Sequence, residues 1–237
     1  WYVSEDKLIE KKKNQFVAEK IDFSNNKIKI QSFIKVGNIE YFGTNQGLWS
    51  RRGKGKINLL KNLNVLSIER TRSDMILVGS KKGLYYINNG KVIAYGPQRT
   101  DEENLNRTAI RDINYISDNE IWYATFGMGL FLQDIGTFST IGPNQGLEPS
   151  GMVFDMITVK EKVYVATRNG LFVYANNKIE RHFTKADGLP SKIILDLDVD
   201  NLGNIWIATS NGISKYTGSK FFNYTRKDGL PSKLATA

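Results

Sequence analysis

The sequence predicts an all-β protein built from a repeated unit of about 40 residues. One observation is a phrase made of a short apolar run, a tight turn and a second run, read as EIWYATFGMGLFL, KVYVATRNGLFVY and NIWIATSNGISKY at 120–132, 162–174 and 204–216. A second is the spacing of its glycine, which recurs after 36, 46, 41 and 42 residues at Gly47, Gly83, Gly129, Gly170 and Gly212. The third is that no segment holds a 3.6-residue apolar stripe over three helical turns.

The last complete unit shows how each element is assigned. Residues 193–200 form a first strand, the NLGN turn follows, and residues 205–209 form a short β-branched and aromatic second strand. Asn211 and Gly212 form a tight turn because both tolerate positive φ. Residues 213–217 and 221–225 are the third and fourth strands, separated by the turn at Gly218. Four antiparallel strands per unit, apolar on both faces of the middle strands, predict the blade of a β-propeller.

The predicted units divide the whole chain. Their approximate bounds are 1–26 (partial), 27–62, 63–96, 97–142, 143–185, 186–226 and 227–237, the start of a further blade. The first unit supplies only its second to fourth strands, and the LATA segment at 234–237 supplies at most part of a first strand. Two interpretations stay open: one propeller whose ends complete a sixth blade, or a fragment of a larger propeller.

Composition excludes several classes of site. With no cysteine and a single histidine, His182, disulfides, thiolate metal sites and cysteine nucleophiles are excluded, and we expect no metal site and no cofactor. No apolar run reaches the length of a membrane span, and the first residues lack the pattern of a signal peptide. The net charge of +9 favours an anionic partner.

Two phrases together carry a family resemblance. DGLPS, at 187–191 and 228–232, and GNIWIATSNGISKYTG, at 203–218, closely resemble the two-component regulator propeller repeat, strongly over 144–233 and less so over 1–96. The resemblance implies the periplasmic sensor region of Bacteroidetes-type hybrid two-component systems, recognition of an oligosaccharide, and kinase activity only in domains outside this chain. It supplies no catalytic position.

Propeller architecture places the turns between second and third strands on the same side of a blade as the links between blades. These turns vary in sequence, as expected of a binding surface. Phe126 and Met128 could stack on sugar rings, although packing over the blade edge is the alternative. The long link at 96–108 belongs to the same side and is either functional or only mobile. The ligand-binding candidates are Asn45, Gln46, Lys81, Lys82, Phe126, Met128, Arg168, Asn169, Ser210 and Asn211.

Two charged groups have a structural alternative. Asp112, Asp155 and Asp196 align in the first strands, with Ser67 and Ser32 in the same column, and either hold a cation or hydrogen-bond to the neighbouring blade. The basic runs fall at turns between third and fourth strands, where they form an anion-binding patch or protect strand edges. Their residues are Lys11, Lys12, Lys13, Arg51, Arg52, Lys54 and Lys56.

The sequence therefore predicts a non-catalytic, ligand-sensing propeller, periplasmic or at the cell surface. The expected partners are an oligosaccharide, which the net charge favours as anionic, adjoining signalling domains or a second propeller, and a second copy in a homodimer. We expect no nucleic acid, because the aromatic residues lie within strands. The alternatives are a protein-interaction scaffold of a cell-surface or secretion system and an axial-site lyase or hydrolase. The last is disfavoured because His182 falls in an outermost strand.

Overall fold

The computed structural model describes residues 2–4, 7–12, 15–23, 27–95, 105, 107–134, 137–147 and 150–230. Over these residues the strands form one three-stranded and five four-stranded sheets. Their order is β1-β2-β3, β4-β5-β6-β7, β8-β9-β10-β11, β12-β13-β14-β15, β16-β17-β18-β19 and β20-β21-β22-β23. Each sheet follows chain order, and its printed pairings are antiparallel. The predicted fold class, a propeller of four-stranded blades with one incomplete blade, is confirmed.

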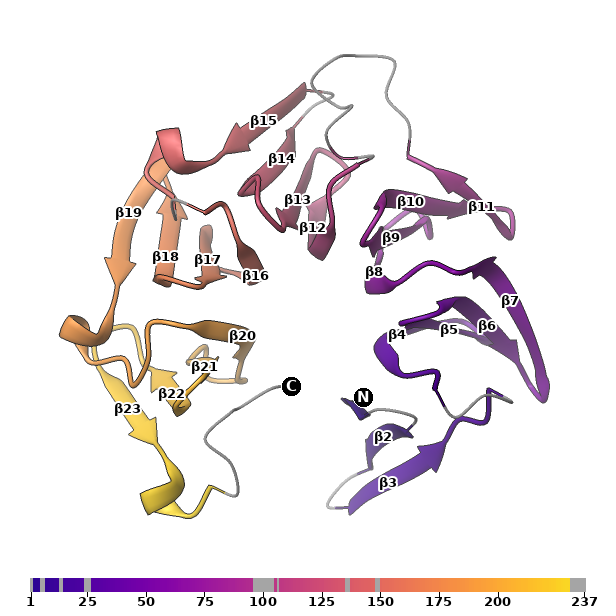
Figure 1. The fold of residues 1–237 in the computed structure, drawn as a ribbon, viewed down its shortest axis with the longest axis horizontal. Helices are drawn as coiled ribbons and strands as arrows, with labels where there is room; N and C mark the ends of the chain where they lie inside the picture. Colours follow the sequence, from indigo (N-terminus) through magenta and orange to yellow (C-terminus); the bar gives the residue numbers. More distant parts are fainter. Residues whose placement is uncertain are drawn as a thin grey trace. The chain divides into compact units, whose positions relative to one another are not determined.

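Within each blade we letter the strands a to d in chain order, and Figure 1 labels them by their β numbers. The incomplete first blade holds strands b to d, which are β1 (Tyr2–Ser4), β2 (Lys7–Lys12) and β3 (Gln15–Lys20). Strands a to d of the second and third blades are β4 (Ile30–Val36), β5 (Ile39–Thr44), β6 (Gly47–Arg52), β7 (Gly55–Lys61), and β8 (Val65–Arg70), β9 (Ile76–Ser80), β10 (Gly83–Asn88), β11 (Lys91–Ala94). Those of the fourth are β12 (Ile110–Ser117), β13 (Glu120–Thr125), β14 (Leu130–Asp134) and β15 (Thr137–Ile141).

The fifth and sixth blades share their strand order, and their strands b and c pair in the same register from the turn outward. They comprise β16 (Val153–Val159), β17 (Lys162–Thr167), β18 (Gly170–Ala175), β19 (Lys178–Phe183), and β20 (Ile194–Val199), β21 (Ile205–Thr209), β22 (Gly212–Tyr216), β23 (Phe221–Tyr224). Short 3₁₀ turns, η1 (Pro143–Gln145), η2 (Lys185–Asp187) and η3 (Arg226–Asp228), lie in the links after strand d. Trp1 and the LATA segment, which bear on how the ends complete a blade, lie outside the described residues.

A buried hydroxyl closes the turn between strands b and c. The last residue of strand b is Thr or Ser, and its side chain donates a hydrogen bond to the carbonyl of the glycine that opens the turn's far side, at 2.7 to 2.9 Å. The backbone N–H of a turn residue donates back to the same hydroxyl. Because a buried hydroxyl needs partners, this pairing explains the recurring Thr or Ser before each turn. The residues are Thr44, Ser80, Thr125, Thr167 and Thr209.

The repeated glycine has a steric cause. Gly212 has φ of 103°, and a Cβ on it would lie 2.3 Å from the carbonyl oxygen of Tyr224 in strand d. The same clash with strand d would occur at Gly47, Gly129 and Gly170. The glycine therefore permits both a left-handed backbone and the close approach of strands c and d.

The chain divides into two compact units, residues 1–121 and 122–237, which are described separately. In the first unit β8 packs against β4 and against β12, and Tyr41, Leu48, Val65 and Val78 are part of a buried cluster. In the second unit β16 packs against β20, and Leu171, Leu189, Ile194 and Ile207 are part of the cluster between the fifth and sixth blades. Burial of apolar residues on both sides of a sheet is what a stack of blades requires.

The DGLPS link is a structured joint. Thr184 caps η2, its hydroxyl accepting from Ala186 N–H, and Asp187 accepts from the Thr184 N–H at 2.8 Å. Gly188 then takes φ of 109° and Leu189 is buried between the blades. Thr225, Asp228 and Gly229 repeat this arrangement in the next link. Among the described residues, no helix is long and apolar enough to cross a membrane.

Candidate ligand-binding surfaces

In the first unit, the turn between β5 and β6 is tied to the link before β4. The Asn45 side chain accepts from the Lys29 N–H at 2.7 Å and donates to the Lys27 carbonyl at 3.0 Å. Gln46 also donates to Lys27, at 3.4 Å. These bonds place the turn and the link on one side of the blade, as the architecture predicts. They also engage both polar atoms of the Asn45 amide in holding the chain.

The sixth blade repeats this arrangement in the second unit. The hydroxyls of Ser210 and Ser191 lie 2.7 Å apart, and the Asn211 amide donates to the Pro190 carbonyl at 3.3 Å. Four of the predicted ligand contacts, Asn45, Gln46, Ser210 and Asn211, therefore hold the turn to the link. The structural role of these residues depends on chain segments about 20 residues away, which the sequence pattern did not reveal.

Lys81 and Lys82 form the turn between β9 and β10 in the first unit. Both side chains are exposed, and the turn is held by backbone groups, with Lys81 N–H donating to Asn64 at 2.9 Å and Lys82 N–H to the Ser80 hydroxyl at 3.1 Å. The two ammonium groups therefore face solvent on the side that carries the link.

Phe126 supplies the aromatic ring among the predicted ligand contacts. Its side chain is 47% exposed, and its ring lies 6.5 Å from that of Phe154. The extra turn residue is accommodated because Gly127 and Gly129 both donate hydrogen bonds to the Gly151 carbonyl in the next link. This bonding holds Phe126 at the surface, whereas Met128 is half-buried.

Arg168 and Asn169 form the turn between β17 and β18. The Arg168 side chain is exposed, whereas Asn169 is half-buried and its carbonyl lies 2.6 Å from His182 Nε2. The His182 ring stacks on Phe172 with ring centres 3.9 Å apart. His182 lies in β19, the outermost strand of its blade, as predicted, and there it supports the turn.

One of the aligned acids in the first strands, Asp155, forms a hydrogen bond to the neighbouring blade. Asp155 in β16 accepts from the Leu197 N–H in β20 at 2.7 Å. A bulge precedes the column position in β4, β8, β16 and β20, and it sets Ser32, Ser67, Asp155 and Asp196 in register. For Asp155, the structural alternative is the observed role. Among the described residues, no group of three acidic or histidine side chains could hold a metal ion.

Another carboxylate, which sequence reasoning missed, lies two residues after Ser67 in the first strand of the third blade. Glu69 lies in β8, and Asp112 lies in the neighbouring strand β12 of the first unit. Burial, and next the Asp112 carboxylate, raise the pKa of Glu69 to about 7. Since Glu69 shares no motif with the other blades, only its surroundings distinguish it.

This raised pKa predicts a pH-dependent stability. The folded state holds the Glu69 proton more firmly than the unfolded state, where the pKa is near 4.5. The contribution of protonated Glu69 to the free energy of unfolding is therefore complete below pH 4.5, and it is lost as the pH rises to about 7. Because the side chain is only partly buried, we expect a loss of about 1–2 kcal/mol in the free energy of unfolding.

Urea unfolding between pH 4 and 8 measures this effect. Glu69→Gln should flatten the profile between pH 4.5 and 7, whereas Glu161→Gln, at an exposed turn, should leave it unchanged. Equal profiles for the wild type and Glu69→Gln would contradict the expectation.

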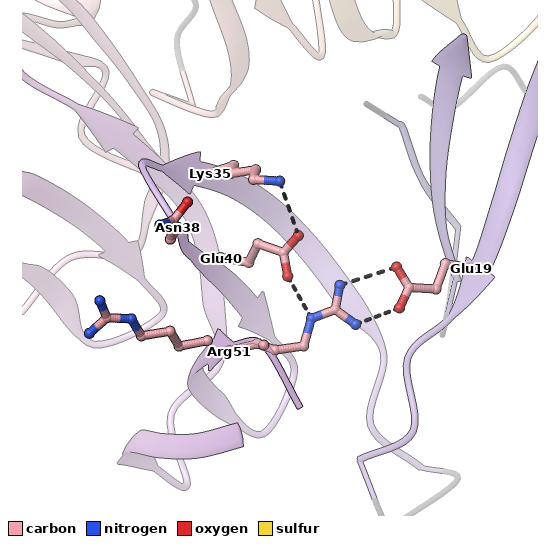
Figure 2. A pocket seen from close by; sticks show the side chains of 7 residues that line it. Glu19, Lys35, Asn38, Glu40 and Arg51 are labelled. Carbon is pink, nitrogen blue, oxygen red and sulfur yellow. Dashed lines mark hydrogen bonds and ion pairs between the residues drawn. The ribbon is translucent and has the colours of Figure 1, made fainter. Parts of the chain in front are cut away.

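The basic run at 51–56 lies at the turn between β6 and β7, as predicted, but its arginine Arg51 is already paired. Arg51 Nε donates to Glu40 at 2.5 Å, and its two terminal nitrogens donate to Glu19 at 2.5 and 3.1 Å (Figure 2). The hydrogen bonds from Arg51 hold the pKa of Glu19 below its ordinary value. Arg51 thus joins β3 of the incomplete blade to the second blade.

The remaining basic residues divide into two groups. Lys56 donates to the Asp22 carbonyl and lies 6.0 Å from the Phe23 ring centre, so it too joins the first two blades. Arg52 and Lys54 are exposed and remain available to an anion. Lys11 and Lys12 lie at the end of β2, and Lys13 lies outside the described residues.

A polar pocket of about 580 Å³ surrounds the Arg51 pairing (Figure 2). It includes Lys35, Asn38 and Arg52 beside Glu19 and Glu40, with Lys35 lying 3.8 Å from Glu40. The sequence predicted the basic side of this pocket and missed its two glutamates. Glu19 lies 32 residues before Arg51, and only the packing of the first two blades brings them together.

The long link at 96–108 is described only at Leu105, Arg107 and Thr108. Leu105 is fully buried, and its carbonyl accepts from the Leu84 N–H at 3.2 Å. The rest of this link, for which a functional and a merely mobile interpretation were left open, lies outside the described residues.

Solved structures with a similar fold include extracellular domains of signalling systems. The extracellular domain of the putative hybrid two component system BT3049 from B. thetaiotaomicron is 18% identical, with a TM-score of 0.73 over 86% of this chain. That of the putative one component system BT4673 from the same organism is 19% identical, with a TM-score of 0.66 over 90% of this chain. This chain covers only 29% and 30% of those two chains. The predicted resemblance to extracellular domains of such systems is confirmed, and at these identities it establishes the fold alone.

A curated protein adds a likeness in sequence. Histidine kinase P4 of Formosa agariphila is 27% identical over 93 residues, which are 39% of this chain and 5% of that protein. No family model matches the chain. The virginiamycin B lyase of Staphylococcus aureus also has a similar fold, at 12% identity, with a TM-score of 0.68 over 93% of this chain and 76% of its own. The fold alone therefore does not distinguish a sensor from a lyase.

Proposed function

We propose that this chain is the extracytoplasmic, ligand-sensing propeller of a two-component signalling protein, in the periplasm or at the cell surface. The observation that carries the proposal is the likeness of the fold to extracellular domains of such systems. The repeated sequence phrases, which resemble the two-component regulator propeller repeat, support it. Binding would be passed on to adjoining signalling domains, to a second propeller or to a second copy of the chain.

The proposed ligand is an oligosaccharide held on the side that carries the b–c turns and the links. Phe126 supports this choice, because an exposed ring held by backbone hydrogen bonds presents a flat apolar face to a sugar. The next turn along the chain contributes the exposed guanidinium of Arg168, a donor of several hydrogen bonds to hydroxyl or acidic groups. Lys81 and Lys82 are the corresponding candidates in the first unit.

Calorimetry of the chain against a glycan library tests the proposal. Phe126→Ala and Arg168→Ala should each weaken binding of a positive glycan by about tenfold, the effect of losing roughly 1.4 kcal/mol. Phe222→Ala and Arg181→Ala are matched controls, because their side chains are exposed on the outermost strands. If the controls weaken binding as much as the two test variants, the proposed surface is wrong.

A second candidate function is a protein-interaction scaffold. The observation that favours it is the outer strand β23, where Phe222 and Tyr224 are 49% and 40% exposed. The same library distinguishes the two functions. If no glycan binds with a dissociation constant below about 1 mM, and a protein partner co-purifies in a manner that depends on β23, then the scaffold function replaces the sensor function.

A further inference from the structure

A separate pocket lies on the proposed binding side of the sixth blade. It has a volume of about 320 Å³ and is lined by Asn211, Thr225, Arg226 and Lys227. Asn211 comes from the turn between β21 and β22, and the other three residues come from the link after β23. This volume is at the lower end of the range for small-molecule sites. It suits one sugar ring or one anionic substituent.

The preceding blade differs from the sixth at one position beside this turn. In the fifth blade His182 occupies the position next to the turn, where its Nε2 lies 2.6 Å from the Asn169 carbonyl and 2.7 Å from where a Gly170 Cβ would stand. The register places Asn223 at the same position of the sixth blade, opposite Ser214 as His182 is opposite Phe172.

Asn223 does not take over the role of His182. Its amide donates to the Gly188 carbonyl at 2.8 Å, and its oxygen accepts from the Ser214 hydroxyl at 2.7 Å. The Asn223 side chain is thus held to the preceding link and not to the turn carbonyl that its counterpart His182 contacts. The sixth blade therefore lacks an imidazole beside the turn that helps to line the pocket.

The pocket is also more basic than its counterpart. The link of the fifth blade has Lys185, Ala186 and Asp187, whereas that of the sixth has Arg226, Lys227 and Asp228. Asp228 accepts from the Thr225 N–H at 2.8 Å and from its hydroxyl at 2.9 Å. These bonds hold the pKa of Asp228 below its ordinary value, so it stays ionised and bound to the cap. One positive charge remains in excess, and the Arg226 and Lys227 side chains are exposed.

We propose that this pocket binds a sulfate or carboxylate group, with Arg226 and Lys227 as the cationic donors and the turn at Asn211 as its wall. That the group is carried by an oligosaccharide rests on the proposed function, whereas the recognition of the anion does not. The combination of a forked guanidinium and an ammonium beside a polar wall is suited to such oxyanions.

Titration of the ¹⁵N-labelled chain with inorganic sulfate, glucuronate and glucose at pH 8 tests the proposal. Sulfate and glucuronate should shift the amide signals of Asn211, Arg226 and Lys227, and glucose should not. The double substitution Arg226→Ala and Lys227→Ala should weaken sulfate and glucuronate binding at least tenfold. The double substitution Lys178→Ala and Lys220→Ala, which removes the same charge beside the c–d turns of the second unit, should leave it unchanged.

A second variant separates the shape of the pocket from its charge. Asn223→His restores the side chain found in the fifth blade, neutral at pH 8, and should weaken binding several-fold without loss of a cation. Equal weakening by the Lys178 and Lys220 control, or an equal response to glucose, would overturn the proposal. A neutral glycan that binds regardless of Arg226 and Lys227, together with no response of the pocket to sulfate or glucuronate, would also overturn it and leave the sensor function standing. If sulfate binds at the pocket but no glycan binds the chain, the proposed anion site stands and the proposed glycan-sensing function is rejected.

Discussion

Gly212→Ala is expected to lower the free energy of unfolding by about 3 kcal/mol or more. The added Cβ would lie 2.3 Å from the Tyr224 carbonyl oxygen, and 3.3 Å from the Tyr224 carbonyl carbon and Thr225 Cα. These are backbone atoms of strand d and its link, so relief of the clash requires β22 and β23 to separate. Thermal and urea unfolding of the chain, followed by circular dichroism, measure the loss.

Gly203→Ala is the matched control. Gly203 also has a positive φ, of 78°, but a Cβ on it would meet nothing within 4 Å. This variant should lose only the conformational cost of the left-handed backbone, about 1 kcal/mol. If both variants lose the same amount, the glycine is required for its backbone conformation alone, and the proposed steric cause is wrong.

Asp155→Ala is expected to have the second-largest effect, about 2 kcal/mol. Its carboxylate accepts from the Leu197 N–H at 2.7 Å, and Leu197 is only 6% exposed. Removal of the acceptor leaves a backbone donor without its partner at the junction of β16 and β20. The free energy of unfolding from urea titration measures the cost, and amide hydrogen exchange at Leu197 should become faster.

Asp155→Asn tests whether hydrogen bonding or charge is responsible. The amide oxygen still accepts a hydrogen bond, so this variant should retain most of the stability and keep Leu197 protected. Asp198→Ala is the control, because it removes an exposed carboxylate from the same β20. Among the described residues, the Asp198 carboxylate accepts a hydrogen bond only from the next residue, Val199 N–H, at 2.7 Å. A loss as large in Asp198→Ala as in Asp155→Ala would show that the effect is general electrostatics.

The blade itself could be predicted because its signals are local. Alternating strands, the Asn-Gly turn at Asn211 and the recurrent glycine each act within a few residues along the chain. The strand at 205–209 was predicted to the residue, and over the described residues the helical elements are short 3₁₀ turns, in keeping with the missing 3.6-residue pattern. The DGLPS link was identified as a joint for the same reason, since Gly188 supplies its left-handed turn.

The candidate site was predicted less completely, because a side chain's partners depend on other blades and links. Asn45 and Asn211 sit in exposed-looking turns, yet their amides hold the preceding links. Arg51 looked like part of an anion-binding run, yet it is paired with Glu19 from another blade. For Phe126 the sequence favoured packing over the blade edge, whereas the exposure of its ring in the structure supports the proposal that it binds.

By itself, the sequence determined the repeat, the four strands of each blade and the side on which turns and links meet. These follow from backbone preferences that act over short distances. Tertiary structure alone decided which charges are neutralised, which acid has a raised pKa and which blade has an open pocket. The difference between His182 and Asn223 shows the reason. Either residue fits the strand, but only the packing around it determines which group its side chain contacts, the Asn169 carbonyl for His182 and the Gly188 carbonyl for Asn223.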